Sequence, residues 1–197
     1  MTAFPKRTSK GQMARPALPL SRQRMQVRFA AVLCLLALLP SAPAATLLVW
    51  PDSPNPNPPY ANWATAAQTI QAAVDAAQPG DTVLATNGVY ASGGRAVYGL
   101  MTNRVVVDKQ LVLQSVNGPD ATIIKGYQVP GGWYGCGDRA VRCLYVTAGA
   151  SVIGFTFTQG ATRSAGDVTQ EQTGGGVWCP GSAYLINCKL IGNALLF

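Results

Sequence analysis

Residues 152–157 read VIGFTF, and residues 185–190 read LINCKL. The shift along the chain that carries Val152 onto Leu185 also carries Leu144 onto Val177. In each stretch every second residue is apolar and the residues between are mostly small or polar, which indicates half-buried β-strands. Because the apolar positions match one repeat apart, the strands are predicted to stack as rungs of a solenoid.

An earlier rung is predicted from Leu111 and Leu113, which would lie one turn before Ile153 and Phe155. This offset is longer than the repeat from Val152 to Leu185, and the excess would then lie in the loop of residues 127–142. An antiparallel sandwich, which also uses short strands, remains the alternative fold.

A helix is predicted ahead of the strands, over residues 65–77 (TAAQTIQAAVDAA), where the apolar residues share one helical face. Pro79-Gly80 would end it. We expect this helix to cap the first coil, because the open end of a solenoid exposes sheet edges and core side chains. In that position Gln71 and Asp75 would face water.

The segment TIQAAVDAAQPGDTVLATNGVYASGG (residues 69–94) resembles the opening of right-handed parallel β-helix proteins of the pectate-lyase-like superfamily. In these proteins a helix plugs the first coil and a GDTV strand follows. The resemblance covers about residues 63–197. It implies an all-β fold, a right-handed parallel β-helix with a short N-terminal capping α-helix. It specifies no activity, because this fold carries lyases, hydrolases, adhesins and stalks alike. Further matches to the next coil and to repeats of large exported bacterial β-helix proteins lie at residues 103–126, 154–160, 174–179 and 187–193.

Residues 1–44 have the features of a secretory signal peptide. Their apolar run, FAAVLCLLALL at residues 29–39, is too short to cross a bilayer as a helix. Small residues, Ala42 and Ala44, stand at the −3 and −1 positions of a cut after Ala44. A start at Met25 would give a more compact leader. We therefore expect a secreted or cell-surface protein whose mature chain has no stable membrane span.

Two further segments follow the leader. Residues 45–62, with PDSPNPNPP at 51–59, are predicted to form an extended proline-rich connector, and residues 63–197 the β-helix. The sequence stops at Phe197, directly after a predicted strand and without a polar cap, which indicates the N-terminal coils of a longer protein. The alternative is a small domain whose Leu195, Leu196 and Phe197 fold back as a minimal plug. An uncovered last coil would also favour end-to-end self-association.

Charge and composition exclude several classes of function. Residues 45–197 hold eight basic and eight acidic residues, so the formal charge of +7 comes from the leader. Nucleic-acid binding is not expected, because it needs a surplus of cations on the folded part. The absence of histidine excludes Ser-His-Asp and Cys-His catalysis and histidine metal sites within this chain.

Four cysteines follow the leader, and in an oxidising compartment an even number favours disulfides. We predict at least one disulfide, with three pairings open; buried free thiols are the alternative, above all for Cys188. The cysteines are Cys136, Cys143, Cys179 and Cys188.

The candidate ligand-binding residues lie in two loops. Trp133 and Tyr134, in a glycine-rich loop, offer apolar ring faces to a sugar, although such residues also pack loops onto a barrel. Asp167 and Glu171 lie in the polar stretch of residues 161–173, either as binding residues on the flank of the solenoid or as part of a solvated loop.

The remaining acidic and amide side chains are predicted to have structural roles. Asp81 and Asp120 stand beside glycine or proline and are expected to bond backbone amides in turns. Asn187 and Asn193, at strand ends, are expected in turns or asparagine ladders.

The sequence thus predicts a binding or structural solenoid at the cell surface or outside the cell, with a polysaccharide or surface glycan as ligand. No catalytic residue, metal or cofactor is predicted. The alternative is the N-terminal part of a polysaccharide lyase or glycoside hydrolase with its active site beyond this chain, and only the lyase would require calcium.

Overall fold

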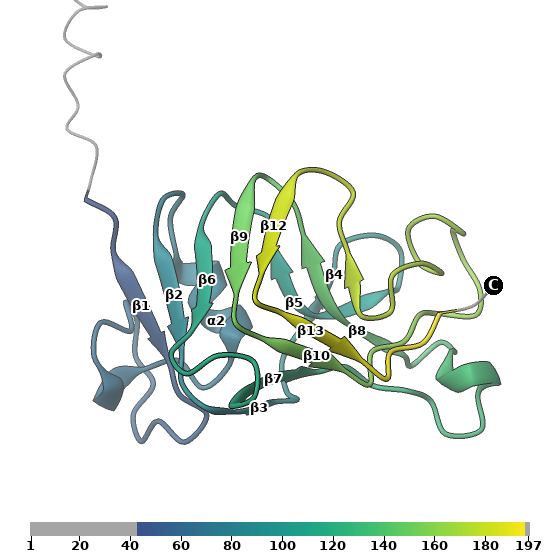
Figure 1. Cartoon of the computed structure of the whole chain (residues 1–197), viewed down its shortest axis with the longest axis horizontal. Coiled ribbons are helices and arrows are strands. Elements are labelled where there is room, and N and C mark those ends of the chain that lie inside the picture. The colour runs from purple at the N-terminus through teal and green to yellow at the C-terminus, as the bar shows by residue number, and fades with distance from the viewer. Residues whose placement is uncertain (1–42, 196–197) are drawn as a thin grey trace, which may run out of the picture. The chain divides into compact units, whose positions relative to one another are not determined.

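Parallel strand pairs repeat along the chain and stack into a solenoid of about four turns (Figure 1). A computed structural model describes residues 43–195. The predicted signal peptide, apart from its last two residues, and the predicted interruption at Phe197 lie outside the described residues.

The strands form three sheets that run the length of the solenoid. All neighbouring strands are parallel except β4 and β5, which are antiparallel. Sheet A holds β1 (Thr46–Val49), β2 (Thr82–Ala85), β6 (Val112–Ser115), β9 (Ala150–Ile153) and β12 (Ala183–Ile186), in that order. Sheet B holds β3 (Gly88–Tyr90), β7 (Thr122–Lys125), β10 (Thr156–Thr158) and β13 (Lys189–Ile191). Sheet C holds β4 (Arg95–Ala96), β5 (Thr102–Val107), β8 (Val141–Val146) and β11 (Val177–Trp178).

The predicted repeat is confirmed by the register of the strands. Val152 pairs with Leu185 in sheet A, and Leu144 pairs with Val177 in sheet C. The parallel pairing also excludes the antiparallel sandwich. At each turn, apolar side chains therefore lie above the apolar side chains of the turn before.

The predicted offset to the previous rung is wrong. Leu113 pairs with Val152 and not with Phe155, whereas Ile124 pairs with Phe157 at the same spacing as Val152 with Leu185. The additional residues of this turn therefore lie between β6 and β7, after Ser115, and not in the loop of residues 127–142. That loop has the same length as its counterpart one turn later, so it adds nothing to the offset.

The core lies inside the three sheets. Val83, Leu113 and Val152 stack in sheet A, while Ile124 and Phe157 stack in sheet B, and all five are fully buried. Burying a side chain of this size contributes about 1.5–3 kcal/mol. The stacked interior therefore supplies the main stabilisation of the fold.

The one α-helix among the described residues, α2, spans Ile70–Ala76, within the predicted range 65–77. Thr69 caps it by accepting a hydrogen bond from the Ala72 N–H. Strand β1 precedes the helix, so residues 46–49 belong to the solenoid and not to a connector. The helix accordingly lies within the first coil and is not the first element of the fold.

The prediction that Gln71 faces water is also wrong. Its side chain is buried against β5, where Oε1 accepts from the Val106 N–H at 2.7 Å and Nε2 donates to the Val106 carbonyl at 3.3 Å. At this edge of sheet C, β4 pairs only with Thr102 and Asn103 at the start of β5. Gln71 bonds the backbone further along β5, at Val106, so β4 and helix α2 together cover the edge.

The two ends of the solenoid differ in how far they are covered. At the N-terminal end the segment of residues 60–67 bonds the outer edge of β1: the Leu48 N–H donates to the Tyr60 carbonyl, and the Ala67 N–H donates to the Leu48 carbonyl. At the other end β12 and β13 each pair on one side only. Core-facing positions are therefore uncovered there, with Leu185 37% and Leu190 55% exposed.

Candidate functional site

Two long loops, each running from sheet B to sheet C, lie one above the other on the flank of the solenoid: the first between β7 and β8 (residues 126–140), the second between β10 and β11 (residues 159–176). The Gly137 N–H of the first loop donates to the Thr162 carbonyl of the second at 3.0 Å. Cys136, Ala140 and Ala161 form a small buried apolar cluster between them. The loops are thus held to each other as successive turns, as the strands are.

Trp133 and Tyr134 project from the first loop into solvent. They are 74% and 72% exposed, their ring centroids lie 6.2 Å apart, and the ring planes meet at 53°. They belong to the short 3₁₀ helix η2 (Trp133–Gly135), whose backbone is fixed by a hydrogen bond from the Cys136 N–H to the Trp133 carbonyl. The two rings are therefore displayed on a fixed backbone and are not packed onto the barrel.

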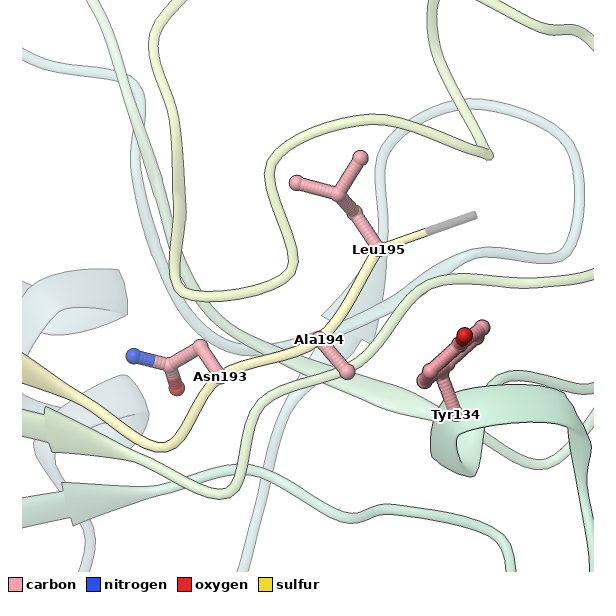
Figure 2. A pocket seen from close by; sticks show the side chains of 4 residues that line it. All are labelled: Tyr134, Asn193, Ala194 and Leu195. Carbon is pink, nitrogen blue, oxygen red and sulfur yellow. The ribbon is translucent and has the colours of Figure 1, made fainter. Parts of the chain in front are cut away.

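A shallow pocket of about 230 Å³ lies between Tyr134 and the segment that follows β13, and Asn193, Ala194 and Leu195 complete its lining. Figure 2 shows the Asn193 amide directed away from Tyr134. That amide accepts from the Gly160 N–H and donates to the Phe157 carbonyl, each at 2.9 Å. Asn193 thus holds the end of strand β10, in the structural role predicted for it. The Tyr134 ring forms the opposite side of the pocket.

Glu171 is buried, and its side chain holds two segments of the chain together. Its carboxylate accepts hydrogen bonds from the Leu100 N–H at 2.8 Å and the Asp167 N–H at 3.0 Å, and it binds Arg163 at 2.6 Å. These contacts lower the pKa of Glu171 to about 2, with the backbone N–H donors as the largest cause. Both oxygens of the carboxylate are therefore engaged by groups of the same chain, and the carboxylate joins the second loop to the segment around Leu100.

Asp167 is exposed at the surface of the same loop and accepts a hydrogen bond from the Gln170 N–H at 2.8 Å. Within residues 43–195, no hydrogen bond, ion pair or ring contact joins Trp133 or Tyr134 to Asp167 or Glu171. The four predicted residues therefore form two separate groups, and the aromatic pair is the accessible one.

A second aromatic group, missed by the sequence analysis, covers the outer face of sheet C. Tyr145 and Trp178 are neighbours in register, with centroids 5.4 Å apart, and the Tyr98 ring meets Trp178 edge-on at 5.6 Å. The Arg142 guanidinium lies 5.0 Å from the Trp178 ring centroid. Burial, with the neighbouring Tyr98, raises the pKa of Tyr145 to about 12. The available signal was the repeat itself, which carries Tyr145 onto Trp178.

The carboxylates of the described residues are mostly engaged in structural contacts. Asp81 accepts from the Gln78 N–H at 2.7 Å, which confirms its predicted turn role, whereas Asp120, predicted for the same role, pairs with the Lys189 side chain instead. Asp75 and Asp108 both bind Arg95. Among residues 43–195 no cluster of three or more acidic or cysteine side chains is placed to hold a metal ion.

The prediction of at least one disulfide is wrong, because all four described cysteines are free. They lie in different parts of the fold, and each sulfur contacts another group. The Cys143 thiol donates to the Thr158 carbonyl in the core, whereas Cys136 contacts Thr162 between the two loops. Cys179 is exposed beside Gly181, and Cys188 bonds the Val152 carbonyl. Burial raises the pKa of Cys143 to about 12.

In the part of the chain that the structure describes, no helix has the length and apolar character to span a membrane. No protein-family model, curated protein or solved structure matches this chain.

Proposed function

We propose that this chain is an exported right-handed parallel β-helix module of the pectate-lyase-like type that binds carbohydrate at the cell surface or outside the cell. The observation that carries the proposal is the pair Trp133 and Tyr134, both more than 70% exposed on a loop with a fixed backbone. The ligand class is a polysaccharide or cell-surface glycan.

The physical basis is the stabilising free energy that these rings forgo while they are exposed to water. Two large aromatic side chains in water forgo the burial that normally stabilises them, and a sugar ring stacked on their faces restores part of it. Because the loop backbone is already hydrogen-bonded, little conformational entropy is lost when the ligand binds. The Tyr134 ring also borders the shallow pocket, where a second part of a sugar chain can lie.

The test is retardation of the protein in native gels that contain soluble polysaccharides, comparing the wild type with the double variant Trp133→Ala, Tyr134→Ala. Removing both rings is expected to weaken binding on the order of tenfold, since aromatic contacts contribute roughly 0.5–1.5 kcal/mol each beyond their area burial. Trp63→Ala, an exposed tryptophan in the N-terminal segment, is the matched control and should bind as the wild type does. Equal binding by the double variant would refute the proposal.

The enzyme alternative is separated in the same incubations. Depolymerisation of pectate or alginate, with or without added calcium, would favour a lyase or hydrolase. Asp81 and Glu171, the two buried carboxylates among the described residues, are bonded within the chain and are not placed for acid–base catalysis.

We also propose a structural role in which two copies associate through the last coil. Five exposed apolar side chains lie on β12 and β13: Tyr184, Leu185, Ile186, Leu190 and Ile191. They offer roughly 500 Å² on each copy, so that two copies reach about the 1,000 Å² that a specific interface needs. The N-terminal edges of β1 and β5 are already bonded within the chain. A head-to-tail contact is therefore disfavoured, and the pairing would be tail to tail.

A further inference from the structure

The backbone nitrogen of Ala45 is hydrogen-bonded to the buried carboxylate of Asp81. Its N–H donates to Oδ1 of Asp81 at 2.8 Å, and the other oxygen of that carboxylate accepts from the Gln78 N–H. The Ala45 carbonyl in turn accepts from the Thr82 N–H at 2.8 Å. Both backbone groups of Ala45 are thus bonded at the start of β2, while residues 43–45 themselves are exposed.

Asp81 and Glu171 are the two buried acidic side chains among the described residues, at 7% and 6% exposure. Buried carboxylates are normally paired with a cation. Glu171 is paired with Arg163. Asp81 bonds two backbone N–H groups, of Gln78 and Ala45, and one of these belongs to the residue that follows the predicted cut after Ala44.

We propose that hydrolysis of the Ala44–Ala45 peptide bond produces an α-ammonium group that remains on Asp81, which makes this carboxylate the binding site of the mature N-terminus. An endoprotease of the signal-peptidase class would catalyse the step as the chain is exported. Water supplies a hydroxyl to the Ala44 carbonyl carbon and a proton to the Ala45 nitrogen. The released amine takes up a further proton at neutral pH, since an α-amino group has a pKa of about 7.7–8.0.

The consequence is a change in the bond that Asp81 makes. Before the cut the donor is a neutral amide, and after it the donor is a cation at the same position. The amide hydrogen bond to the carboxylate is already charge-assisted, and the cut adds the attraction between two full opposite charges. Processing would therefore fasten strand β1 more firmly to β2. The inference rests on the export part of the proposed function and not on sugar binding.

The first measurement is the N-terminal residue of the protein secreted when the full 197-residue chain is produced in an exporting bacterial host. Intact mass and N-terminal sequencing should identify Ala45. Any other N-terminus, or an uncut chain in the secreted fraction, overturns the inference. Sugar binding is assayed independently, so the proposed function can fail while this result stands, and the reverse.

The second measurement compares Asp81→Asn in the secreted chain and in the uncut chain produced without export. If Asp81 binds an ammonium, the substitution should lower the folding equilibrium constant about fivefold more in the secreted chain. Equal losses in the two forms would show that Asp81 acts only as a turn cap, and would overturn the inference.

A third measurement leaves the sequence unchanged. Cyanate at about pH 6 carbamylates an α-amine ahead of lysine, because the α-amine has the lower pKa. Carbamylation of the secreted wild-type chain removes the charge at Ala45 and should lower the folding equilibrium constant about fivefold. An unchanged equilibrium constant would overturn the inference.

Discussion

The guanidinium of Arg142 on β8 donates to the side-chain oxygen of Asn103 on β5 at 2.8 Å, and the two residues are neighbours in register. The same guanidinium donates to the carbonyls of Gln170, Thr173 and Gly174 in the second loop. Burial lowers the pKa of Arg142 to about 10. One side chain thus ties the second loop to sheet C.

We therefore expect Arg142→Met to lower the free energy of unfolding by on the order of 3 kcal/mol, because it leaves the buried Asn103 oxygen and three partly buried carbonyl oxygens without this donor. Chemical denaturation monitored by circular dichroism measures this. Arg139→Met is the control, since Arg139 is exposed, and it should change the stability by less than about 0.5 kcal/mol. A loss no greater than that of the control would contradict the role assigned to Arg142.

Acid should loosen the second loop through Glu171. Its pKa is about 2 in the folded protein against an ordinary value of 4.5. A depressed pKa stabilises the fold fully above the ordinary value, and this contribution disappears as pH falls from about 4.5 towards 2. Hydrogen exchange at the Leu100 and Asp167 amides, both bonded to Glu171, should accelerate over that range beyond the intrinsic change.

Glu171→Gln is the control for this pH effect. The variant should show faster exchange at neutral pH and no added dependence between pH 4.5 and 2. If the variant retains the pH dependence of the wild type, another carboxyl group is responsible.

Replacing Gln71 should open the N-terminal edge of sheet C. Gln71→Leu keeps the size of the side chain but leaves the Val106 N–H and carbonyl without partners, which costs about 1–3 kcal/mol for each buried group left unpaired. Thermal and urea unfolding measure the loss. Gln114→Leu, at an exposed position on β6, should be close to neutral. Equal effects of the two substitutions would exclude the edge-closing role.

The four described cysteines should differ in their reactivity towards an alkylating reagent, followed by peptide mass spectrometry. Cys179 is exposed and should react first, whereas Cys143 is fully buried with a pKa of about 12 and should react only on unfolding. Cys179→Ser should remove the fast reaction. Recovery of a disulfide-linked peptide from the non-reduced protein would contradict the free thiols.

Tail-to-tail association should appear as a dimer in light scattering at micromolar concentrations, and Leu190→Lys should weaken it on the order of 100-fold by placing a charge in the interface. Val89→Lys, on the exposed part of β3 at the other end, should leave it unchanged. Hydrogen exchange of wild-type β12 and β13 should slow as concentration rises. A monomer, or a filament in place of a dimer, would contradict this pairing.

The repeat was predictable because it depends on side chains that the sequence shows directly. The alternation in residues 152–157 and its return at residues 185–190 indicated both the strands and their register, and the pairing of Val152 with Leu185 confirms it. The longer step from Leu113 to Val152 was not predictable, because an insertion in a turn leaves the apolar pattern of the flanking strands unchanged.

Gln71 shows a second limit of prediction from hydrophobic periodicity. A polar residue on an amphipathic helix ordinarily marks the solvent face, and nothing in the helix indicates that a bare strand edge needs a partner there. That partner, Val106, lies 35 residues further along the chain. Its requirement becomes visible only once sheet C is assembled.

The candidate site was predictable where its signal lies in the local sequence. Trp133 and Tyr134 lie among glycines, and that local composition predicted a surface loop. The polar loop predicts Glu171 as a ligand-binding residue, whereas its contact with the Leu100 amide, 71 residues away in the sequence, is not visible there. Contacts of that range are set by the stacking of turns and leave no local signal.

The covered N-terminal edge of the solenoid sets the order in which its coils can assemble. The coil that is synthesised first is also the one whose strand edges are bonded from outside, by Gln71 and by the segment of residues 60–67. Each later coil then has a completed neighbour on one side and a free edge on the other. The solenoid can therefore grow in the order of translation, with every new strand added to a template that already exists.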